Sequence, residues 1–402
     1  MNNSSVNNNW KKIFALIYTG QAFSVIGSSA AQFAIIWYLT IKTQSAVVLT
    51  IASVVGFLPQ GLISPFAGVW VDRYNRKTVM MLSDGFVALC GGILGVSFLF
   101  GEPSVWFIYV ILFLRAMGST FHAPAMTAAI PSLVPEEYLV KSGGWGQAVT
   151  SGSNMLGPVI GSFMMSIATV PIVMLVDILG AMLAILTLAS VKVPNVERTN
   201  KDNRFFDDLK EGIFALLNNK ALISMGIPML IASVLCMPLS SLLPLLVNKY
   251  FGGGEIATGI SRFLYSGGYV VGALALGIFG KGEKQFKMIS ISLVILGVAA
   301  TCGGILPKEG FGIFLFLIFA FGVAATCYLV PYTAYIQKNL NPGVIGKVMS
   351  LLMSIMSLAV PVGLAFAGPL ADAIGINTWY FVSGVLIIIT GLWTVAIARK
   401  YE

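Results

Sequence analysis

The chain has 402 residues, of which 57% are hydrophobic and only 10% are charged. Soluble domains carry about 25% charged residues, so this composition excludes a soluble globular protein and predicts a membrane protein. The net charge of +8 does not indicate nucleic-acid binding, because the basic residues stand at the ends of apolar segments and form no stripe interleaved with aromatic residues.

The cysteines lie inside apolar segments and show neither the spacing of a disulfide framework nor that of a metal site. They are Cys90, Cys236, Cys302 and Cys327. We expect four buried thiols, no metal and no cofactor.

The first half of the chain contains six apolar segments long enough to cross a membrane, which takes about 20 mostly apolar residues. A polar tail, residues 1–12, precedes them. The first apolar run is long for a signal-peptide core, so we expect a retained first span. Breaks at polar residues, Gly and Pro give the predicted spans 13–40, 45–71, 78–100, 104–126, 142–168 and 171–191.

A polar linker, residues 192–220, separates these spans from six more. Within it, the segment 205–217 has apolar residues near helical spacing, which predicts an amphipathic helix at the cytosolic surface; a plain linker is the alternative. The second set of predicted spans is 221–248, 256–280, 286–306, 311–336, 346–371 and 376–397. We therefore expect an all-α membrane protein with twelve transmembrane helices, six in an N-terminal bundle (1–191) and six in a C-terminal bundle (221–402).

The basic residues support this even number of spans, with both termini in the cytosol. On that topology 19 of the 24 lysines and arginines fall in cytosolic segments, and only Lys42, Lys249 and Lys308 fall in external loops. Lys and Arg collect on the cytosolic side of membrane proteins. One span more or fewer would destroy the asymmetry.

The two halves of the chain echo each other. Two prolines eleven residues apart flank the loop after the fourth span, and a second such pair, 207 residues later, flanks the loop after the tenth. These prolines are Pro124, Pro135, Pro331 and Pro342. A weaker echo pairs GVWVD (68–72) with GPLAD (368–372), on opposite faces of the membrane. Internal repeats of this kind are typical of secondary transporters.

The cytosolic loop GVWVDRYNRK, residues 68–77, concentrates charge in a chain that has little. Its distinctive residues are Gly68, Asp72, Arg73, Arg76 and Lys77. The glycine permits close helix approach, the aspartate can meet the positive end of a helix, and the basic residues can face anionic lipid. A simple positive-inside anchor is the alternative.

This loop resembles the signature loop of the major facilitator superfamily, Gly-x-x-x-Asp-Arg-x-Gly-Arg-Lys, with Asn75 in place of the second glycine. Asn tolerates a left-handed backbone, so the departure is mild. The resemblance implies the major facilitator fold. It also assigns the glycine and charged residues of the loop to a conformational latch between the two halves, with Asp72 and Arg73 as its main members.

Within the fifth span, the stretch GWGQAVTSGSNMLGPVIGS, which starts at Gly144, resembles the exporter motif of the same superfamily. Gly144, Gly157, Pro158 and Gly161 fit the motif, while serines at 153 and 162 replace two of its glycines. The resemblance implies a proton-coupled antiporter and favours export over uptake. Small residues also let helices pack closely in any membrane protein, which is the alternative interpretation.

Two carboxylates and an arginine lie well inside predicted spans, where a charge costs at least about 2.5 kcal/mol and is a functional hypothesis by default. They are Asp84, Arg115 and Asp177. We expect Asp84 to pair with Arg115 and all three to be candidates for proton coupling; a purely structural pair is the alternative. Arg262 is interpreted as shallow and snorkelling outward, and the single histidine, His122, as a helix-end residue.

In this superfamily, spans 1, 4, 7 and 10 line the central cavity. The first, seventh and tenth spans here carry polar or aromatic side chains at helical spacing. The candidates for substrate contact are Gln21, Ser24, Ser28, Gln32, Ser233, Met237, Ser240, Tyr328, Tyr332 and Tyr335. Tyr and Met offer adaptable apolar surface for a bulky amphipathic compound, although polar side chains between helices often serve packing alone.

Over most of its length the chain is similar to the macrolide-efflux (Mef-type) branch of the superfamily. That resemblance implies a monomeric secondary transporter in the bacterial cytoplasmic membrane, which exports lipophilic, macrolide-like drugs in exchange for protons by alternating access. Export of a siderophore or another metabolite is the alternative. A membrane enzyme is disfavoured because the spans hold no cluster of His, Asp or Glu. An ATP-driven pump is disfavoured because no phosphate-binding loop is present, and a scaffold would not need the exporter motif.

Overall fold

The computed structural model describes residues 10–71, 74–135, 138–191, 205–279, 285–340 and 342–401. All regular secondary structure in these ranges is helical, and twelve of the helices have 21 residues or more. Each of the twelve coincides with one predicted span, with ends that differ by a few residues. By length and hydropathy, nine apolar helices in the described ranges are sufficient to cross a membrane.

Residues 1–42 and 55–200 form one compact unit, called unit 1, and residues 43–54 and 201–402 form the other, called unit 2. The division near residue 200 falls inside the polar linker. The segment 43–54 is unexpected, because it assigns the first turns of the second helix to unit 2 and the remainder to unit 1.

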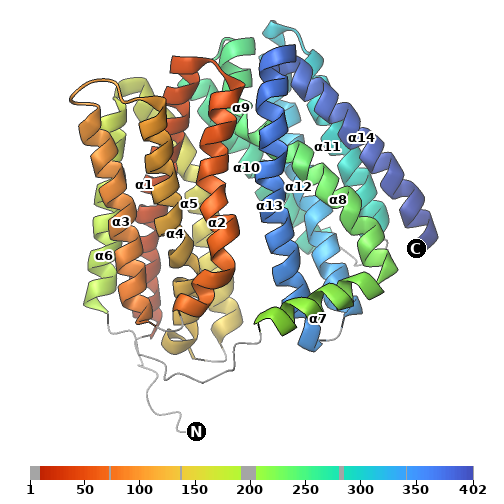
Figure 1. Cartoon of the computed structure of the whole chain (residues 1–402), viewed down its shortest axis with the longest axis horizontal. Coiled ribbons are helices and arrows are strands. Elements are labelled where there is room, and N and C mark those ends of the chain that lie inside the picture. The colour runs from red at the N-terminus through yellow and green to blue at the C-terminus, as the bar shows by residue number, and fades with distance from the viewer. Residues whose placement is uncertain are drawn as a thin grey trace. The chain divides into compact units, whose positions relative to one another are not determined.

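Unit 1 is a bundle of antiparallel helices joined by short loops (Figure 1). Its helices are α1 (Trp10–Thr43), the part of α2 (Ala46–Val71) from residue 55 onward, α3 (Arg76–Ser97), α4 (Val105–Leu133), α5 (Leu139–Ile167) and α6 (Val170–Ser190). Side chains that cap the backbone define two of the starts. Asn75 accepts a hydrogen bond from the N–H of Thr78 at α3, and Ser104 accepts one from Phe107 at α4, both at 3.3 Å. Such caps satisfy amide groups that a helix start leaves unpaired.

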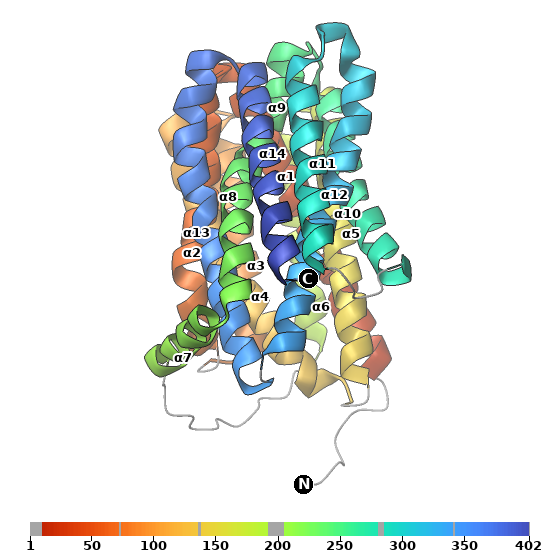
Figure 2. The same cartoon turned by 90° about the vertical axis from the view of Figure 1, so that its right-hand side faces the viewer.

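After the segment 43–54, unit 2 continues with a short helix, α7 (Phe205–Asn218), at the position of the predicted amphipathic helix. Figure 2 shows α7 beside the lower end of α13 and at an angle to the long helices. Phe214 and Leu217 of α7 are 66% and 60% exposed in the isolated protein. A helix that lies in the membrane interface buries such side chains at the headgroup boundary.

The long helices of unit 2 are α8 (Lys220–Ser241), α10 (Glu255–Phe279), α11 (Gln285–Ile305), α12 (Phe311–Asn339), α13 (Pro342–Ile374) and α14 (Ile376–Tyr401). The seventh span, predicted as one segment from 221 to 248, is interrupted. α8 ends at Ser241, and the chain continues through α9 (Leu243–Leu245) and a π-helical turn, Leu246–Tyr250. Pro244 lacks an N–H group and disrupts a continuous helix at this point.

Glycines let helices approach closely within each unit. In unit 2, a Cβ on Gly322 of α12 would lie 2.2 Å from the carbonyl oxygen of Tyr265 in α10, and a Cβ on Gly384 of α14 would lie 2.3 Å from the N of Thr301 in α11. Small residues at helix contacts replace the hydrophobic driving force that is missing between helices in lipid.

Candidate functional site: two acids one heptad apart in unit 1

Four helices of unit 1 bring the intramembrane charges together. α3 and α4 run antiparallel, and α6 packs against α3 on the other side (Figure 1). Asp84 and Gly91 of α3 are seven residues apart, as are Arg115 and His122 of α4. Seven residues are about two helical turns and about 10.5 Å. The four positions therefore form two layers on facing sides of α3 and α4.

The first layer is an ion pair between Arg115 and Asp177 of α6. Arg115 Nη1 lies 2.5 Å from Asp177 Oδ2, and the two side chains are 6% and 0% exposed. The same nitrogen donates to the carbonyl oxygen of Val87 at 3.2 Å, and Ser28 Oγ of α1 donates to Asp177 Oδ1 at 2.7 Å. Both carboxylate oxygens therefore have a donor, as a buried charge requires.

Glycines make room for this pair. A Cβ on Gly91 would lie 2.9 Å from Arg115 Nη1 and 3.0 Å from Asp177 Oδ2. On the opposite side, a Cβ on Gly27 of α1 would lie 3.0 Å from the Cα of Asp177. A side chain at either position would push α1 or the guanidinium away from the carboxylate.

The second layer surrounds Asp84. Gln21 Nε2 donates to its Oδ2 at 3.1 Å, and Ser24 Oγ lies 3.4 Å from its Oδ1. His122 Nε2 lies 3.6 Å from Asp84 Oδ2, which is too far for a hydrogen bond. That nitrogen is buried and has no hydrogen-bond partner among the described residues.

The expected pair of Asp84 and Arg115 is therefore wrong, because Arg115 binds Asp177. Antiparallel packing of α3 and α4 places Arg115 level with Gly91, one heptad beyond Asp84. The interpretation of His122 as a helix-end residue is also wrong, because α4 continues to Leu133. The histidine lies in the helix interior and faces Asp84.

An apolar cluster closes one end of this polar network. It consists of the buried side chains Ile17, Val71, Met80, Ala125, Ala129, Leu188 and Val191. Ile17 and Met80 lie one turn before Gln21 and Asp84 on the same helices, and Ala125 lies one turn after His122 on the antiparallel α4. The apolar cluster is therefore the layer directly below Asp84.

The exporter-motif glycines of α5 contact α1. A Cβ on Gly157 would lie 2.2 Å from the Cβ of Ser29, and a Cβ on Gly161 would lie 2.8 Å from the carbonyl oxygen of Ala30. Pro158 lies inside the helix between them, and the surroundings of Gly144 are outside the described part. These residues let α5 pack closely on α1, the helix that carries Ser28.

The signature loop is described only in part. Asp72 and Arg73 lie outside the described residues, as do the surroundings of Gly68. Arg76 begins α3. Lys77 Nζ donates to the carbonyl oxygens of Ala189 and Val191 at 2.8 and 2.7 Å, so it satisfies the C-terminal carbonyl groups of α6 and complements the negative end of the helix dipole. The latch role of the loop stays a prediction.

The weaker sequence echo of that loop, GPLAD at 368–372, has a defined contact inside unit 2. The Asp372 carboxylate accepts hydrogen bonds from the N–H groups of Ala46 and Val47 at 2.6 and 3.0 Å and from Ser45 Oγ at 2.7 Å. It therefore caps the first turn of α2 and meets the positive end of the helix dipole. Burial raises the pKa of Asp372, but these hydrogen bonds and the nearby Lys249 outweigh burial and hold the pKa below its ordinary value.

The expected substrate residues divide into several groups. On α1, the side chains of Gln21, Ser24 and Ser28 bind the two acids, and Gln32 is exposed. On α12, the Tyr332 hydroxyl donates to the carbonyl oxygen of Leu222 at 3.2 Å, which commits it to packing on α8.

The remaining candidates have other surroundings. Tyr335 lies against Phe286 with ring centroids 4.5 Å apart. Tyr328 and Ser233 interact with each other, Met237 is 37% exposed, and Ser240 interacts with Tyr265 of α10. Ser233, Tyr328, Ser240 and Tyr265 therefore mark the polar positions of this set in the interior of unit 2. Their contact with substrate stays a prediction.

Sequence reasoning missed the aromatic side chains near this group. The rings of Tyr265 and Tyr269 in α10 are in edge-to-face contact, and their hydroxyl oxygens are 3.4 Å apart. Arg262 lies near Tyr265 and near Tyr380 of α14, which is only 2% exposed. Arg262 is half-buried beside these tyrosines, and its expected shallow, snorkelling position stays a prediction. The run RFLY places Arg262 and Tyr265 three residues apart, a spacing that brings side chains to one helix face.

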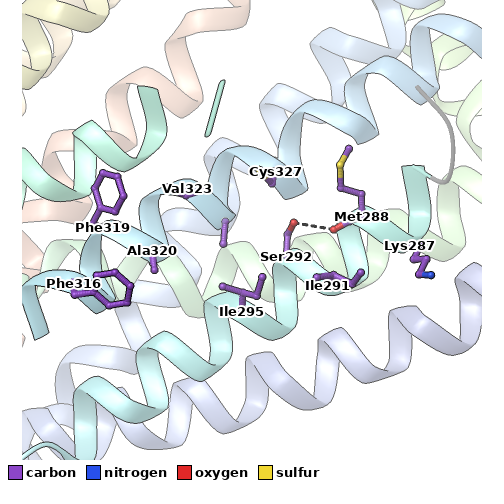
Figure 3. A pocket seen from close by; sticks show the side chains of 11 residues that line it. Lys287, Met288, Ile291, Ser292, Ile295, Phe316, Phe319, Ala320, Val323 and Cys327 are labelled. Atoms are coloured by element: carbon purple, nitrogen blue, oxygen red, sulfur yellow. Dashed lines mark hydrogen bonds between the residues drawn. The ribbon is translucent and has the colours of Figure 1, made fainter. Parts of the chain in front are cut away.

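A pocket of about 520 Å³ lies elsewhere, between α11 and α12 (Figure 3). Its lining is Lys287, Met288, Ile291, Ser292, Ile295, Phe316, Phe319, Ala320, Val323, Ala324 and Cys327. Ile291, Ile295 and Phe316 are exposed, so this is an apolar groove on the surface of unit 2. It contains none of the expected substrate residues.

Comparisons with known proteins identify the family. The sequence model described as Major Facilitator Superfamily matches residues 17–281. Macrolide efflux protein A of Streptococcus pyogenes is 38% identical over 383 residues, which cover 95% of each chain. Macrolide efflux protein A of Enterococcus faecalis is 35% identical over 322 residues, which cover 80% of this chain and 99% of the relative.

A more distant relative and a solved structure agree with this assignment. The multidrug efflux pump Tap of Mycobacterium tuberculosis is 24% identical over 401 residues, with 96% of this chain and 94% of the relative covered. A bacterial homologue of the human lysosomal transporter Spinster superposes with a TM-score of 0.79 at 12% identity and covers 98% of both chains, a likeness of fold alone. The predicted all-α major facilitator fold is confirmed, and the chain belongs to the Major Facilitator Superfamily, in the branch that contains the macrolide efflux proteins.

Proposed function

We propose that this protein exports lipophilic, macrolide-like drugs from the cell in exchange for protons. The observation that carries the proposal is the pair of buried acids in unit 1, one bound to Arg115 and the other one heptad away without a fixed cation. The names of the relatives from Streptococcus pyogenes and Enterococcus faecalis support macrolides as the class of substrate.

Charge balance suggests different roles for the two acids. Protonation of Asp177 would leave the buried guanidinium of Arg115 without its counter-charge, which is costly in a medium of low polarity. Asp84 receives only neutral hydrogen bonds from Gln21 and Ser24. It can therefore take up and release a proton without leaving a cation unpaired. We assign proton exchange to the layer that contains Asp84 and the fixed charge of the network to Arg115 and Asp177.

The drug would contact unit 2, where hydroxyl and aromatic groups gather. Ser233, Met237, Ser240 and Tyr328 are the positions that we assign to substrate contact, together with Tyr265. A site of this composition offers apolar area and a few hydrogen-bonding groups, which is the usual character of a drug-sized binding site. We further propose a monomer with both termini in the cytosol, on the basis of the Lys and Arg distribution.

Transport in proteoliposomes tests the proposal. With an acidic lumen, protons that leave should drive a radiolabelled macrolide inward, and a protonophore should abolish the uptake. Protein-free liposomes correct for passive trapping of a basic drug. Asp84→Asn should lose gradient-driven uptake, whereas Glu102→Gln, a matched change at a carboxylate that is 72% exposed, should keep it.

The outcomes separate the parts of the proposal. Uptake that is unaffected by the protonophore would rule out proton antiport. No response to any macrolide, combined with proton-driven movement of another compound, would rule out the substrate class alone. Full gradient-driven uptake by Asp84→Asn would remove that acid from the coupling.

A further inference from the structure

His122 is the only histidine among the 402 residues, and the structure leaves its Nε2 in an unusual position. The atom is buried and has no hydrogen-bond partner among the described residues, although a carboxylate oxygen of Asp84 lies 3.6 Å away. Buried polar atoms are nearly always hydrogen-bonded, so an exception calls for an explanation.

The surroundings limit what can satisfy this nitrogen. From α3 the nearby charged group is Asp84, and from α1 the polar groups are Gln21 and Ser24, which already donate to that carboxylate. Arg115 of α4 and Asp177 of α6 are one heptad away and bind each other. On the other side lies the apolar cluster. Asp84 is therefore the one charged group in the described part of the site that is placed to bind the imidazole.

A proton on Nε2 would give this nitrogen a hydrogen-bond partner and would give the facing Asp84 oxygen a further donor. In the neutral tautomer with its proton on Nδ1, the Nε2 lone pair faces a carboxylate oxygen, and the two repel. With a proton on Nε2, the N–H can donate to Asp84 Oδ2 in a charge-assisted hydrogen bond, for which the usual distance is about 2.7–2.9 Å. A small rotation of either side chain closes the remaining gap.

We propose that His122 and Asp84 form a proton-sharing pair that carries the exchangeable proton of the transporter. The empty pair consists of neutral imidazole and carboxylate, with a net charge of −1. In the empty pair the imidazole proton is on Nδ1; a hydronium ion then transfers a proton to Nε2, which breaks one of its O–H bonds, leaves a water molecule and gives imidazolium hydrogen-bonded to carboxylate, with a net charge of zero. Release reverses the step: the Nε2–H bond breaks and the proton returns to a water molecule.

Charge neutrality gives this pair an advantage over a lone acid. In the loaded state the imidazolium and the carboxylate balance each other, just as Arg115 and Asp177 do in the neighbouring layer. The two layers then carry no net charge, which lowers the cost of holding them inside a membrane. The transport role of the pair rests on the proposed antiport, whereas proton sharing between the two side chains does not.

The single histidine permits a direct spectroscopic test. The full-length protein is labelled with 15N-histidine, purified through a tag without histidine and placed in lipid nanodiscs, so that the imidazole of His122 gives the only histidine signals. At about pH 6.5, where a free imidazole is half protonated, the wild type should show a hydrogen-bonded imidazolium. In Asp84→Asn the ratio of imidazolium to imidazole should fall about tenfold or more, as expected when a close opposite charge is removed.

Two further measurements keep the test decisive. Asp84→Glu should restore the imidazolium, and Glu102→Gln should leave the signal unchanged. If Asp84→Asn does not fold, the wild type alone decides, because an imidazole that stays neutral throughout pH 5–8, hydrogen-bonded or not, would overturn the proposal. An imidazolium that persists unchanged in Asp84→Asn would overturn it as well.

The transport role has its own test, so that its failure differs from failure of the proposed function. Purified His122→Gln should bind a macrolide but lose drug-induced proton movement in proteoliposomes. If the wild type couples protons and His122→Gln does so equally well, the pair does not carry the proton although antiport stands. If the wild type itself moves no protons, antiport fails while the spectroscopic result for the pair remains valid.

Discussion

Breaking the ion pair of Arg115 and Asp177 should have a large and strongly non-additive effect on stability. Asp177→Asn keeps the shape of the side chain and an oxygen for Ser28, yet leaves the guanidinium without a counter-charge. Arg115→Met leaves the Asp177 carboxylate without its counter-charge. Because the two side chains are 6% and 0% exposed and lie 2.5 Å apart, each single change should cost about 3–5 kcal/mol, the usual loss when one partner of a buried pair is removed.

The double variant provides the critical comparison. Replacing both members of a buried pair by neutral groups is often close to neutral for stability. Asp177→Asn with Arg115→Met should therefore be clearly more stable than either single variant, and the coupling energy should reach about 3 kcal/mol or more. Unfolding in mixed detergent micelles, followed by tryptophan fluorescence, measures all four proteins.

A simple outcome would refute this reasoning. If the two single losses add in the double variant, the two side chains do not interact, since independent sites are additive. Two single losses below about 0.5 kcal/mol would mean that water reaches the pair and screens it, as at exposed ion pairs.

Three further predictions follow from glycine contacts and the cap of α2. Gly91→Ala should impair gradient-driven uptake because its Cβ would lie 2.9 Å from Arg115 Nη1. Gly92→Ala should transport normally, because its Cβ would meet only a flexible side-chain end at 3.4 Å. Equal activities of the two variants would show that the space at Gly91 is not needed. Gly157→Ala should lower the thermal unfolding temperature through overpacking worth about 1–3 kcal/mol, while Gly152→Ala, with nothing within 4 Å, serves as the control. Asp372→Ala should cost about 0.5–2 kcal/mol through the lost cap. Since the pKa of Asp372 is lowered in the folded protein, the cap contributes fully above the ordinary pKa of an aspartate and fades as pH falls through the lowered value; stability that rises on acidification in the wild type relative to Asp372→Ala would contradict this assignment.

The positions of the twelve long helices could be predicted from sequence because length and hydropathy are properties of single segments. Lateral neighbours could not be, since hydropathy does not say which faces meet. The error over Asp84 and Arg115 arose in this way: both residues were correctly placed inside spans, but the partner of Arg115 comes from α6 and is 62 residues away along the chain.

Helix length accounts for another part of the difference. The fourth span was expected to end near residue 126, but α4 continues to Leu133, and the extra turns move His122 from the helix end into the interior. The interruption at Leu242 could have been inferred from Pro238 and Pro244. The cap by Asp372 was visible only as a weak repeat of five letters, because the contact joins residues more than 300 positions apart.

The apolar cluster below Asp84 acts as an insulator. A chain of water molecules needs polar partners along its length, and the side chains of Ile17, Met80 and Ala125 offer none. Under the proposed antiport, a proton would therefore reach Asp84 in this arrangement from the direction of Asp177 or from the side of the bundle, and its passage through the cluster would require these apolar side chains to separate.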